Sequence, residues 1–199
     1  MSEFNLDDIK IIVGLGNPGT EYEQTRHNAG AMMLTYLQNQ WNFPEFKHDK
    51  YSNAMLSKGT GDRGQGTGRE RVANASATST LYPVPCTLVF PHTFMNESGQ
   101  SVAYLMEKEH LQPEQLLVLH DDKDFNFEEL KLQKEISSAG HKGVQSIIDC
   151  LGTSNFWRLR IGIGPVPEPM TTDIFVLQKF NTDETKKLDS IFQRAVELI

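Results

Sequence analysis

The chain has 199 residues, which fits one domain, and its 38% apolar residues exclude a chain that is disordered throughout. A formal net charge of −7, from 19 Lys+Arg against 26 Asp+Glu, argues against a protein that coats nucleic acid non-specifically, although a local basic patch is compatible with it. No run approaches the roughly 18 apolar residues of a membrane helix, and the acidic start MSEFNLDDIK is unlike a signal or transit peptide, so we expect a soluble, cytoplasmic protein, with a mitochondrial location left open.

The first segment predicts a strand, a loop and a helix. The run DIKIIVGLG is β-branched and ends in glycines, which indicates a buried strand from Ile9 to Val13. The loop NPGTEYEQTRHNAG begins with turn chemistry at residues 17 to 19. A helix follows, because AGAMMLTYLQNQW has apolar residues at helical spacing, namely Met33, Tyr36, Leu37 and Trp41.

Residues 14 to 19, GLGNPG, match the dinucleotide-binding pattern G-x-G-x-x-G. In that motif the loop runs directly into a helix whose free N–H groups meet a pyrophosphate, but Pro18 has no N–H and the helix is expected to begin only near Asn28. The acidic residue expected about 20 positions on is also absent. We therefore interpret the match as a coincidence and rank a dinucleotide-dependent oxidoreductase third among the functions.

Two further strands are predicted at residues 51 to 58 and 86 to 90. Between them, residues 59 to 80 are rich in Gly, Ser, Thr, Ala and Arg and lack large apolar side chains, so we expect a flexible insertion on the surface. The alternative is an arm that grips RNA through its basic residues, Arg63, Arg69 and Arg71.

The next segment predicts a helix and then a buried strand. After a turn at residues 96 to 99, one helical face carries Val102, Leu105 and Met106. The run LLVLHDD, residues 116 to 122, is apolar until its carboxyl end, where it carries His120 and Asp121.

The last segment predicts helix, strand and helix. The apolar residues of GHKGVQSIIDCLG recur at i, i+3, i+4 and i+7, and WRLRIGIG alternates in a way that predicts one buried face and one wetter face carrying Arg158 and Arg160. An apolar stripe predicts a C-terminal helix that begins after residues 181 to 183. Strands that alternate with helices predict a single-domain α/β fold with a mixed, largely parallel sheet flanked by helices.

His27 and Asp121 are the candidate catalytic pair. His27 lies in a T-R-H-N cluster between a strand-end loop and a helix, and Asp121 ends another strand, at the edge of an α/β sheet where ligands bind. No serine or cysteine has a nucleophile-elbow pattern, so water is the expected nucleophile. A structural histidine is the alternative. The two cysteines, Cys86 and Cys150, fit neither a zinc pattern nor a disulfide framework.

Five strings in order, VGLGNPGTEYEQTRHNAG, PHTFMNESG, VLHDD, GHKGVQSI and FWRLRIGIG, make the chain closely resemble the bacterial-type peptidyl-tRNA hydrolase family. The resemblance covers about residues 9 to 199 apart from the insertion. It implies one α/β domain, a monomer, no metal and no cofactor. The implied substrate is peptidyl-tRNA, cleaved at the ester between the peptide and the terminal ribose of the acceptor end.

The resemblance also implies roles for particular residues. His27 matches the catalytic histidine, and Asp121 matches the aspartate that keeps this histidine in its basic form. Asn17 and Asn96 match asparagines that position the substrate, and Asn17 is linked to telling N-blocked from free aminoacyl-tRNA. Two aromatic residues match positions associated with the tRNA acceptor end or the peptide, with ordinary loop packing as the alternative, namely Tyr22 and Phe94.

The chain departs from the family pattern where Lys142 replaces an asparagine that contacts substrate. Lysine cannot accept a hydrogen bond, but it can meet a phosphate or a developing oxyanion. The preceding KEISSA replaces a glycine-rich stretch, and we expect the family's last segment over the cleft, after the C-terminal helix, to be short or absent. The departure keeps open an RNA-binding relative without turnover. Candidates for a local positive surface are Lys131, Lys134, Lys142, Arg158 and Arg160.

Overall fold

The computed structural model describes residues 3–59, 85–134 and 136–199. The predicted insertion at 59 to 80, with the alternative RNA-gripping arm, lies outside the described residues apart from Gly59. None of the helices in these ranges is both long and apolar enough to cross a membrane.

One seven-stranded sheet forms the centre of the molecule, in the order β2-β3-β4-β1-β5-β7-β6. Neighbours within β4-β1-β5-β7 run parallel, whereas β2, β3 and β6 join antiparallel. This is the expected mixed sheet around a parallel centre. The strands are β1 (Ile11–Gly14), β2 (Lys47–Asp49), β3 (Ala54–Lys58), β4 (Thr87–Pro91), β5 (Leu116–Asn126), β6 (Leu130–Lys134) and β7 (Trp157–Gly164).

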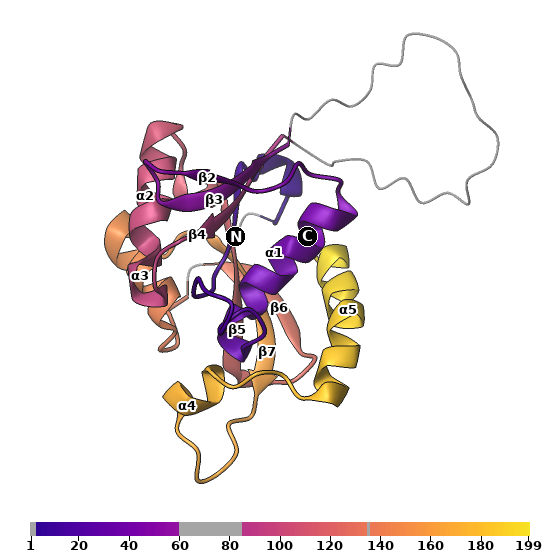
Figure 1. The fold of residues 1–199 in the computed structure, drawn as a ribbon. Coiled ribbons are helices and arrows are strands. Elements are labelled where there is room, and N and C mark those ends of the chain that lie inside the picture. Colours follow the sequence, from indigo (N-terminus) through magenta and orange to yellow (C-terminus); the bar gives the residue numbers. More distant parts are fainter. Residues whose placement is uncertain (1–2, 60–84, 135) are drawn as a thin grey trace, which may run out of the picture.

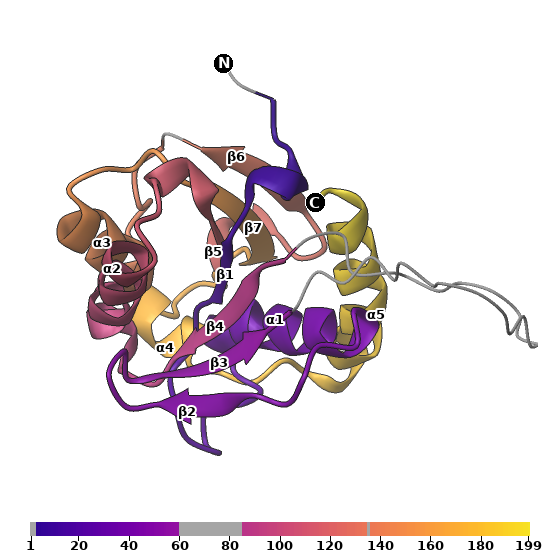
Figure 2. The same ribbon diagram turned by 90° about the horizontal axis from the view of Figure 1, so that it is seen from above.

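Helices cover both faces of the sheet (Figures 1 and 2). One face packs against α1 (Ala29–Gln40) and α5 (Thr182–Glu197), and the other against α2 (Ser98–Lys108) and α3 (Lys142–Leu151). The short α4 (Thr172–Val176) lies near the carboxyl ends of β5 and β7. Four 3-10 turns complete the elements, namely η1 (Leu6–Asp8), η2 (Arg26–Asn28), η3 (Met95–Glu97) and η4 (Pro113–Gln115).

Strand β1 shows why the sheet is buried on both sides. Ile12 faces the cluster that contains α1 and α5, and Ile11 and Val13 face the cluster that contains α2 and α3; all three are at most 2% exposed. A continuous apolar run of this kind is typical of a parallel strand whose two faces are both covered. The prediction of a buried strand at this position is confirmed.

Gly30 allows the start of α1 to lie directly on β5. A Cβ atom at Gly30 would lie 2.1 Å from the carbonyl oxygen of Leu119, so no other residue fits without a backbone shift. Leu119 is two residues before Asp121, and His27 precedes α1 in the turn η2. This close approach therefore brings the two predicted catalytic residues to the same place.

The prediction of a wetter face on β7 is wrong. Arg158 is only 1% exposed and Arg160, on the same face of β7, is half-buried, so this face is covered as well. The guanidinium Nη2 of Arg158 donates to the carbonyl oxygens of Ile136 and Ser137, at 2.8 Å each. These two hydrogen bonds compensate for burial of the charge, while Nε of Arg158 has no hydrogen-bond partner among the described residues. They also hold Ile136 and Ser137 in the loop before α3.

Candidate active site

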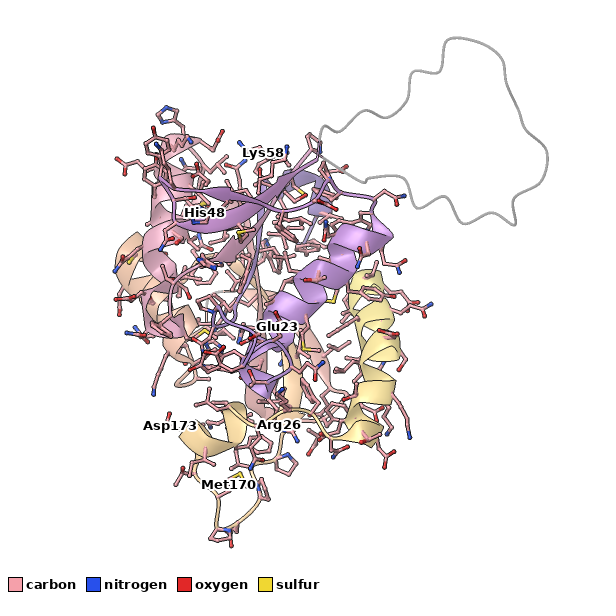
Figure 3. The ribbon with its side chains drawn as sticks, in the orientation of Figure 1. Glu23, Arg26, His48, Lys58, Met170 and Asp173 are labelled. Carbon is pink, nitrogen blue, oxygen red and sulfur yellow. The ribbon has the colours of Figure 1, made fainter. Side chains whose placement is uncertain are left out.

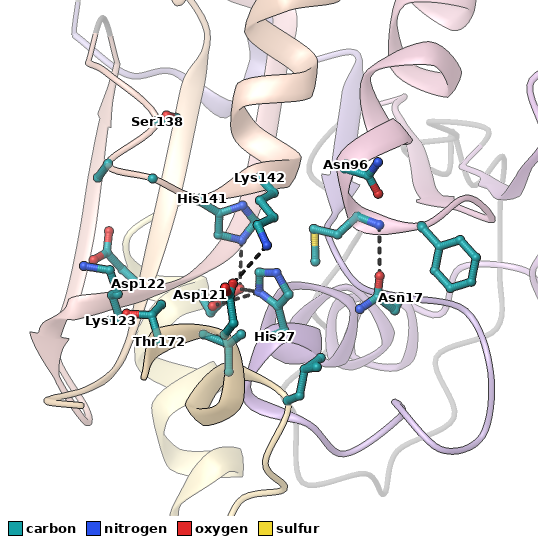
Figure 4. Close-up of a pocket in the computed structure, with 17 residues that line it drawn as sticks. Asn17, His27, Asn96, Asp121, Asp122, Lys123, Ser138, His141, Lys142 and Thr172 are labelled. Atoms are coloured by element: carbon teal, nitrogen blue, oxygen red, sulfur yellow. Dashed lines mark hydrogen bonds and ion pairs between the residues drawn. The ribbon is translucent and has the colours of Figure 1, made fainter. Parts of the chain in front are cut away.

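A cavity of about 470 Å³ opens at the carboxyl ends of the parallel strands (Figure 4). Its walls come from the loops after β1 and β4, from β5, from the start of α3 and from α4. Six of the seven residues predicted from the sequence line it, namely Asn17, His27, Phe94, Asn96, Asp121 and Lys142. Tyr22 does not line it; this residue is half-buried in the preceding loop, where its carbonyl oxygen accepts from the N–H and the hydroxyl of Thr25.

His27 and Asp121 form a buried hydrogen-bonded pair in this cavity. The Nδ1 atom of His27 lies 2.9 Å from Oδ1 and 3.1 Å from Oδ2 of Asp121. An ionised carboxylate only accepts, so Nδ1 carries the proton and Nε2 holds a lone pair in the neutral imidazole. Nε2 has no hydrogen-bond partner among the described residues. The pair therefore has the geometry of a general base with its orienting carboxylate.

Electrostatics make His27 a stronger base than a free histidine. Burial lowers the pKa of His27, but the charge and the hydrogen bond of Asp121 outweigh it, so the net pKa lies above 6.5. Lys142 lowers this pKa and Asp173 raises it. Burial raises the pKa of the Asp121 carboxyl, but His27 and His141 lower it more. The net pKa of Asp121 is well below the usual range of an aspartate, so the carboxylate is ionised at neutral pH.

His141, which the sequence reasoning passed over, is the second partner of Asp121. Its Nε2 lies 2.9 Å from Oδ1 of Asp121, and its Nδ1 accepts from the N–H groups of Gly143 and Val144. His141 is thus the N-cap of α3. The sequence signal was its position one residue before an amphipathic helix.

His27, Asp121 and His141 also place metal-ligand atoms within 4.8 Å of one another. A metal ion needs the imidazole nitrogen lone pairs, whereas here both nitrogens that face Asp121 donate N–H bonds to it. These two hydrogen bonds account for the closeness of the three side chains.

Asn17 is held from two sides. Its Oδ1 accepts from the backbone N–H of Met95 at 2.9 Å, which ties the loop after β1 to η3. The Asn28 side chain bonds both the N–H and the carbonyl oxygen of Asn17, at 2.9 Å each. Asn28 is a positioning residue that the sequence reasoning did not assign. With Oδ1 engaged, the Nδ2 donor of Asn17 is left for a ligand, and the exposed Asn96 lies beside the same cavity (Figure 4).

Lys142 already has a partner in this structure. Its Nζ lies 2.9 Å from Oδ1 of Asp173 in α4, and the two side chains are 63% and 78% exposed. The pair joins two walls of the cavity. Exposed ion pairs are weak, so an anionic ligand can compete for the ammonium group.

Arg26, beside His27, anchors the chain that carries α4. Its guanidinium makes two hydrogen bonds with the Glu184 carboxylate, at 3.0 and 2.8 Å, and lies over the rings of Phe175 and Phe180. Figure 3 shows Arg26 and Asp173 at the same end of the molecule. Arg26 is 6% exposed, so it contributes to the position of α4 and not to a free basic surface.

Two of the five predicted tRNA-binding cations are committed elsewhere. Arg158 is buried, so its assignment to a surface patch is wrong. Arg160 bonds Asp122 through Nε at 2.6 Å, lies over the Phe125 ring, and has an 11% exposed side chain. Of the remainder, Lys131 is exposed and Lys134 is half-buried on β6.

Comparison with known proteins identifies the family of the chain. A family model described as "Peptidyl-tRNA hydrolase" matches residues 11–199. The chain is 36% identical to the peptidyl-tRNA hydrolase of Gloeobacter violaceus, over 96% of this chain and 86% of that protein, and 36% identical to that of Aquifex aeolicus, over 96% and 88%. The crystal structure of peptidyl-tRNA hydrolase from Acinetobacter baumannii superposes with a TM-score of 0.78 at 30% identity, covering 98% of this chain and 89% of that one. The chain therefore belongs to the peptidyl-tRNA hydrolase family and is an enzyme of that class.

Proposed function

We propose that this enzyme hydrolyses peptidyl-tRNA by means of a water molecule that His27 activates. The observation that carries the proposal is the buried His27–Asp121 pair at the wall of a cavity that Asn17 and Asn96 also line. Membership of the family supports the same reaction.

Nε2 of His27 takes a proton from water, and the water oxygen attacks the carbonyl carbon of the ester. The ester C–O bond then breaks, and the proton passes from His27 to the departing ribose oxygen. Asp121 keeps the proton of neutral His27 on Nδ1 and stabilises the imidazolium that forms in between. The products are a peptide carboxylic acid, which ionises by releasing its proton to solvent, and a tRNA with an intact terminal ribose.

Asn17 and Asn96 are proposed to position the peptide part. The Nδ2 group of Asn17 can donate to a peptide carbonyl oxygen or to the developing oxyanion, because its Oδ1 is held by Met95. An N-blocked residue presents an additional amide that a free aminoacyl ester lacks. A site built to bond that amide discriminates against substrates that leave it unpaired.

The acceptor end of the tRNA is proposed to enter past Phe94 and Lys142. Phe94 is 58% exposed at the cavity, which is unusual for a large apolar side chain and suits stacking against a base. Lys142 would exchange Asp173 for a phosphate or the oxyanion. Tyr22 is proposed to contact the acceptor end from outside the cavity wall. The enzyme is further proposed to act as a cytoplasmic monomer that needs no cofactor.

The test is release of N-acetylaminoacyl groups from tRNA by the purified protein without added metal. We expect release from N-acetylaminoacyl-tRNA and far less from free aminoacyl-tRNA. Binding of the same tRNA with no release would instead support the alternative, an RNA-binding relative without turnover. Presence of His27, Asp121, Asn17 and Asn96 at one cavity favours the enzyme.

A further inference from the structure

His141 uses all of its hydrogen-bonding capacity within the protein. Nδ1 accepts from Gly143 at 3.1 Å and from Val144 at 3.2 Å, so that nitrogen needs its lone pair. The proton of the neutral ring is therefore on Nε2, which donates to Oδ1 of Asp121 at 2.9 Å. Protonation of Nδ1 would break both bonds to the start of α3. The tautomer of the neutral His141 ring is therefore determined by its neighbours.

The ring of His141 is also confined from both sides. Its centroid lies 4.8 Å from that of His27 and 4.8 Å from that of His120. His120 is 1% exposed, and its Nδ1 donates to the carbonyl oxygen of Asp121 at 2.7 Å. Burial, with His141 and Arg158 nearby, holds the pKa of His120 well below its usual value, so His120 adds no charge.

Oδ1 of Asp121 therefore receives N–H bonds from two imidazoles with different surroundings. His27 has a free Nε2 at the cavity, whereas His141 is saturated. Only His27 can exchange a proton with substrate. His141 cannot act as a base, yet it shares the carboxylate on which the base depends.

We propose that His141 is a positioning residue for the proposed hydrolysis: as a hydrogen-bond donor to Oδ1 it fixes Asp121 and limits how much of the carboxylate's charge acts on His27. The proposal rests on His27 as the general base. If Asp121 accepted a hydrogen bond from His27 alone, the imidazolium of His27 would hold its proton more tightly. Less of His27 would then be the neutral base near neutral pH. Fixing Oδ1 also keeps the His27 ring in the orientation that points Nε2 at the cavity.

The titratable groups around His27 come from four parts of the fold. Asp121 and His120 are on β5, His141 precedes α3, Lys142 begins α3, and Asp173 is on α4. Lys142 and Asp173 have opposite effects on the pKa of His27 and form an exposed pair with each other. Salt distinguishes the effects of Lys142 and Asp173 on the pKa of His27 from the effect of His141, because salt screens exposed charges much more than buried ones.

Two substitutions divide the roles of His141. Asn in His141→Asn can place its oxygen near the site of Nδ1 and keep the N-cap, but it is too short to replace Nε2. Gln in His141→Gln can place an amide nitrogen near Nε2 and keep the donor to Asp121, but it loses the cap. His110→Asn is the matched control, because His110 is exposed and has φ of 53°, which Asn tolerates.

The readouts are the pH profile of kcat, KM and the NMR titration of the His27 ring in each protein. We expect His141→Asn to shift the His27 midpoint to higher pH and to lower the plateau kcat by about three- to tenfold, with KM little changed. His141→Gln should keep the wild-type midpoint and unfold at a lower temperature, and His110→Asn should match wild type. An unshifted midpoint and plateau in His141→Asn would overturn the proposal, as would equal shifts in both variants.

The NMR measurement separates this proposal from the reaction itself. If the wild-type protein releases no N-acetylaminoacyl groups, the proposed function fails, but the His27 titration still reports the effect of His141. If His141→Asn does not fold, the NMR chemical shifts of the two ring nitrogens of His141 in the wild-type protein test the proposal instead. They are expected to show a proton on Nε2 and none on Nδ1, since Nδ1 accepts from Gly143 and Val144. A proton on Nδ1 in the neutral ring would overturn the proposal.

Discussion

Nδ1 of His27 lies 2.9 Å from Oδ1 of Asp121, although 94 residues separate the two in the chain. The contact exists because η2 lies against β5 near Asp121, in the middle of that strand, where Gly30 lets α1 approach the backbone of β5. Most of the expected effects of substitution follow from this pair and from the charges around it.

Removal of the base tests the mechanism most directly. We expect His27→Ala to lower kcat by about 10² to 10⁴, the range typical of a lost general base, with tRNA binding and the far-UV circular dichroism spectrum retained. Single-turnover release of N-acetylaminoacyl groups measures the effect. His110→Ala, at an exposed histidine, serves as the control. A His27→Ala enzyme with wild-type kcat would exclude His27 as the base.

Asp121→Asn should separate the orienting role of Asp121 from its charge. Asp121 raises the pKa of His27, so removal of the charge lowers that pKa. His27 is the active base when neutral, so activity is lost as pH falls through its pKa, and the acid limb of the kcat profile should move to lower pH. The plateau should also fall, since the amide no longer holds the proton on Nδ1. A pH titration of kcat checks both effects, and an unchanged profile would make Asp121 purely structural.

Substitutions of Lys142 and Asp173 should shift the acid limb of the kcat profile in opposite directions. Lys142 lowers the pKa of His27 and Asp173 raises it, so Lys142→Ala should move the limb to higher pH and Asp173→Asn to lower pH. Both shifts should shrink at high salt, because the two side chains are exposed.

Lys142 is also expected to bind the substrate. Lys142→Ala should lower kcat/KM by about five- to tenfold, since a charged hydrogen bond contributes about 1.5 to 3 kcal/mol and the lost pair with Asp173 offsets part of it. Lys142→Asn, which introduces the asparagine of the family pattern, should be tolerated. Equal kcat/KM for all three proteins at low and high salt would show that Lys142 has no role in binding.

Asn17→Asp tests whether Asn17 recognises the N-blocked group of the substrate, and it changes the shape of the side chain little. The carboxylate keeps the oxygen that accepts from the Met95 N–H but replaces the Nδ2 donor. We expect kcat/KM for N-acetylaminoacyl-tRNA to fall by about ten- to hundredfold, in line with a lost hydrogen bond to a charged or polarised group. Its ratio to the value for free aminoacyl-tRNA should fall as well. Discrimination equal to wild type would assign the selection to another residue.

Gly30→Ala tests how the fold brings the pair together. The added Cβ would lie 2.1 Å from the Leu119 carbonyl oxygen and 2.9 Å from the Leu15 nitrogen, both of them backbone atoms. We expect a loss of about 1 to 3 kcal/mol in the free energy of unfolding, measured by urea denaturation, together with lower activity. Gly152→Ala is a comparison, because its neighbourhood is open and only its φ of 69° is unfavourable. A Gly30→Ala protein as stable as wild type would mean that α1 can move away from β5.

Several elements could be predicted from the sequence because their signal is local. The apolar run at β5, the helical spacing in α1 and α3, and the N-cap asparagine Asn181 of α5 each depend on neighbours within one or two turns. The elements that were missed, β2, β6 and α4, have three to five residues each and little periodicity. Their structure comes from pairing with β3 and β7 or from packing against Arg26.

The residue types of the site were already visible in the sequence, as His27, Asp121, Asn17 and Asn96 in loops and strand ends. What only the tertiary structure decided is which groups share a proton or a charge, because these contacts join segments that are far apart in the chain. Three examples are the hydrogen bond of His141 to Asp121, the hydrogen bond of Asn28 to Asn17 and the ion pair of Asp173 with Lys142. The burial of Arg158 is a further case, since the alternation of β7 shows which side a residue faces but not what covers that side.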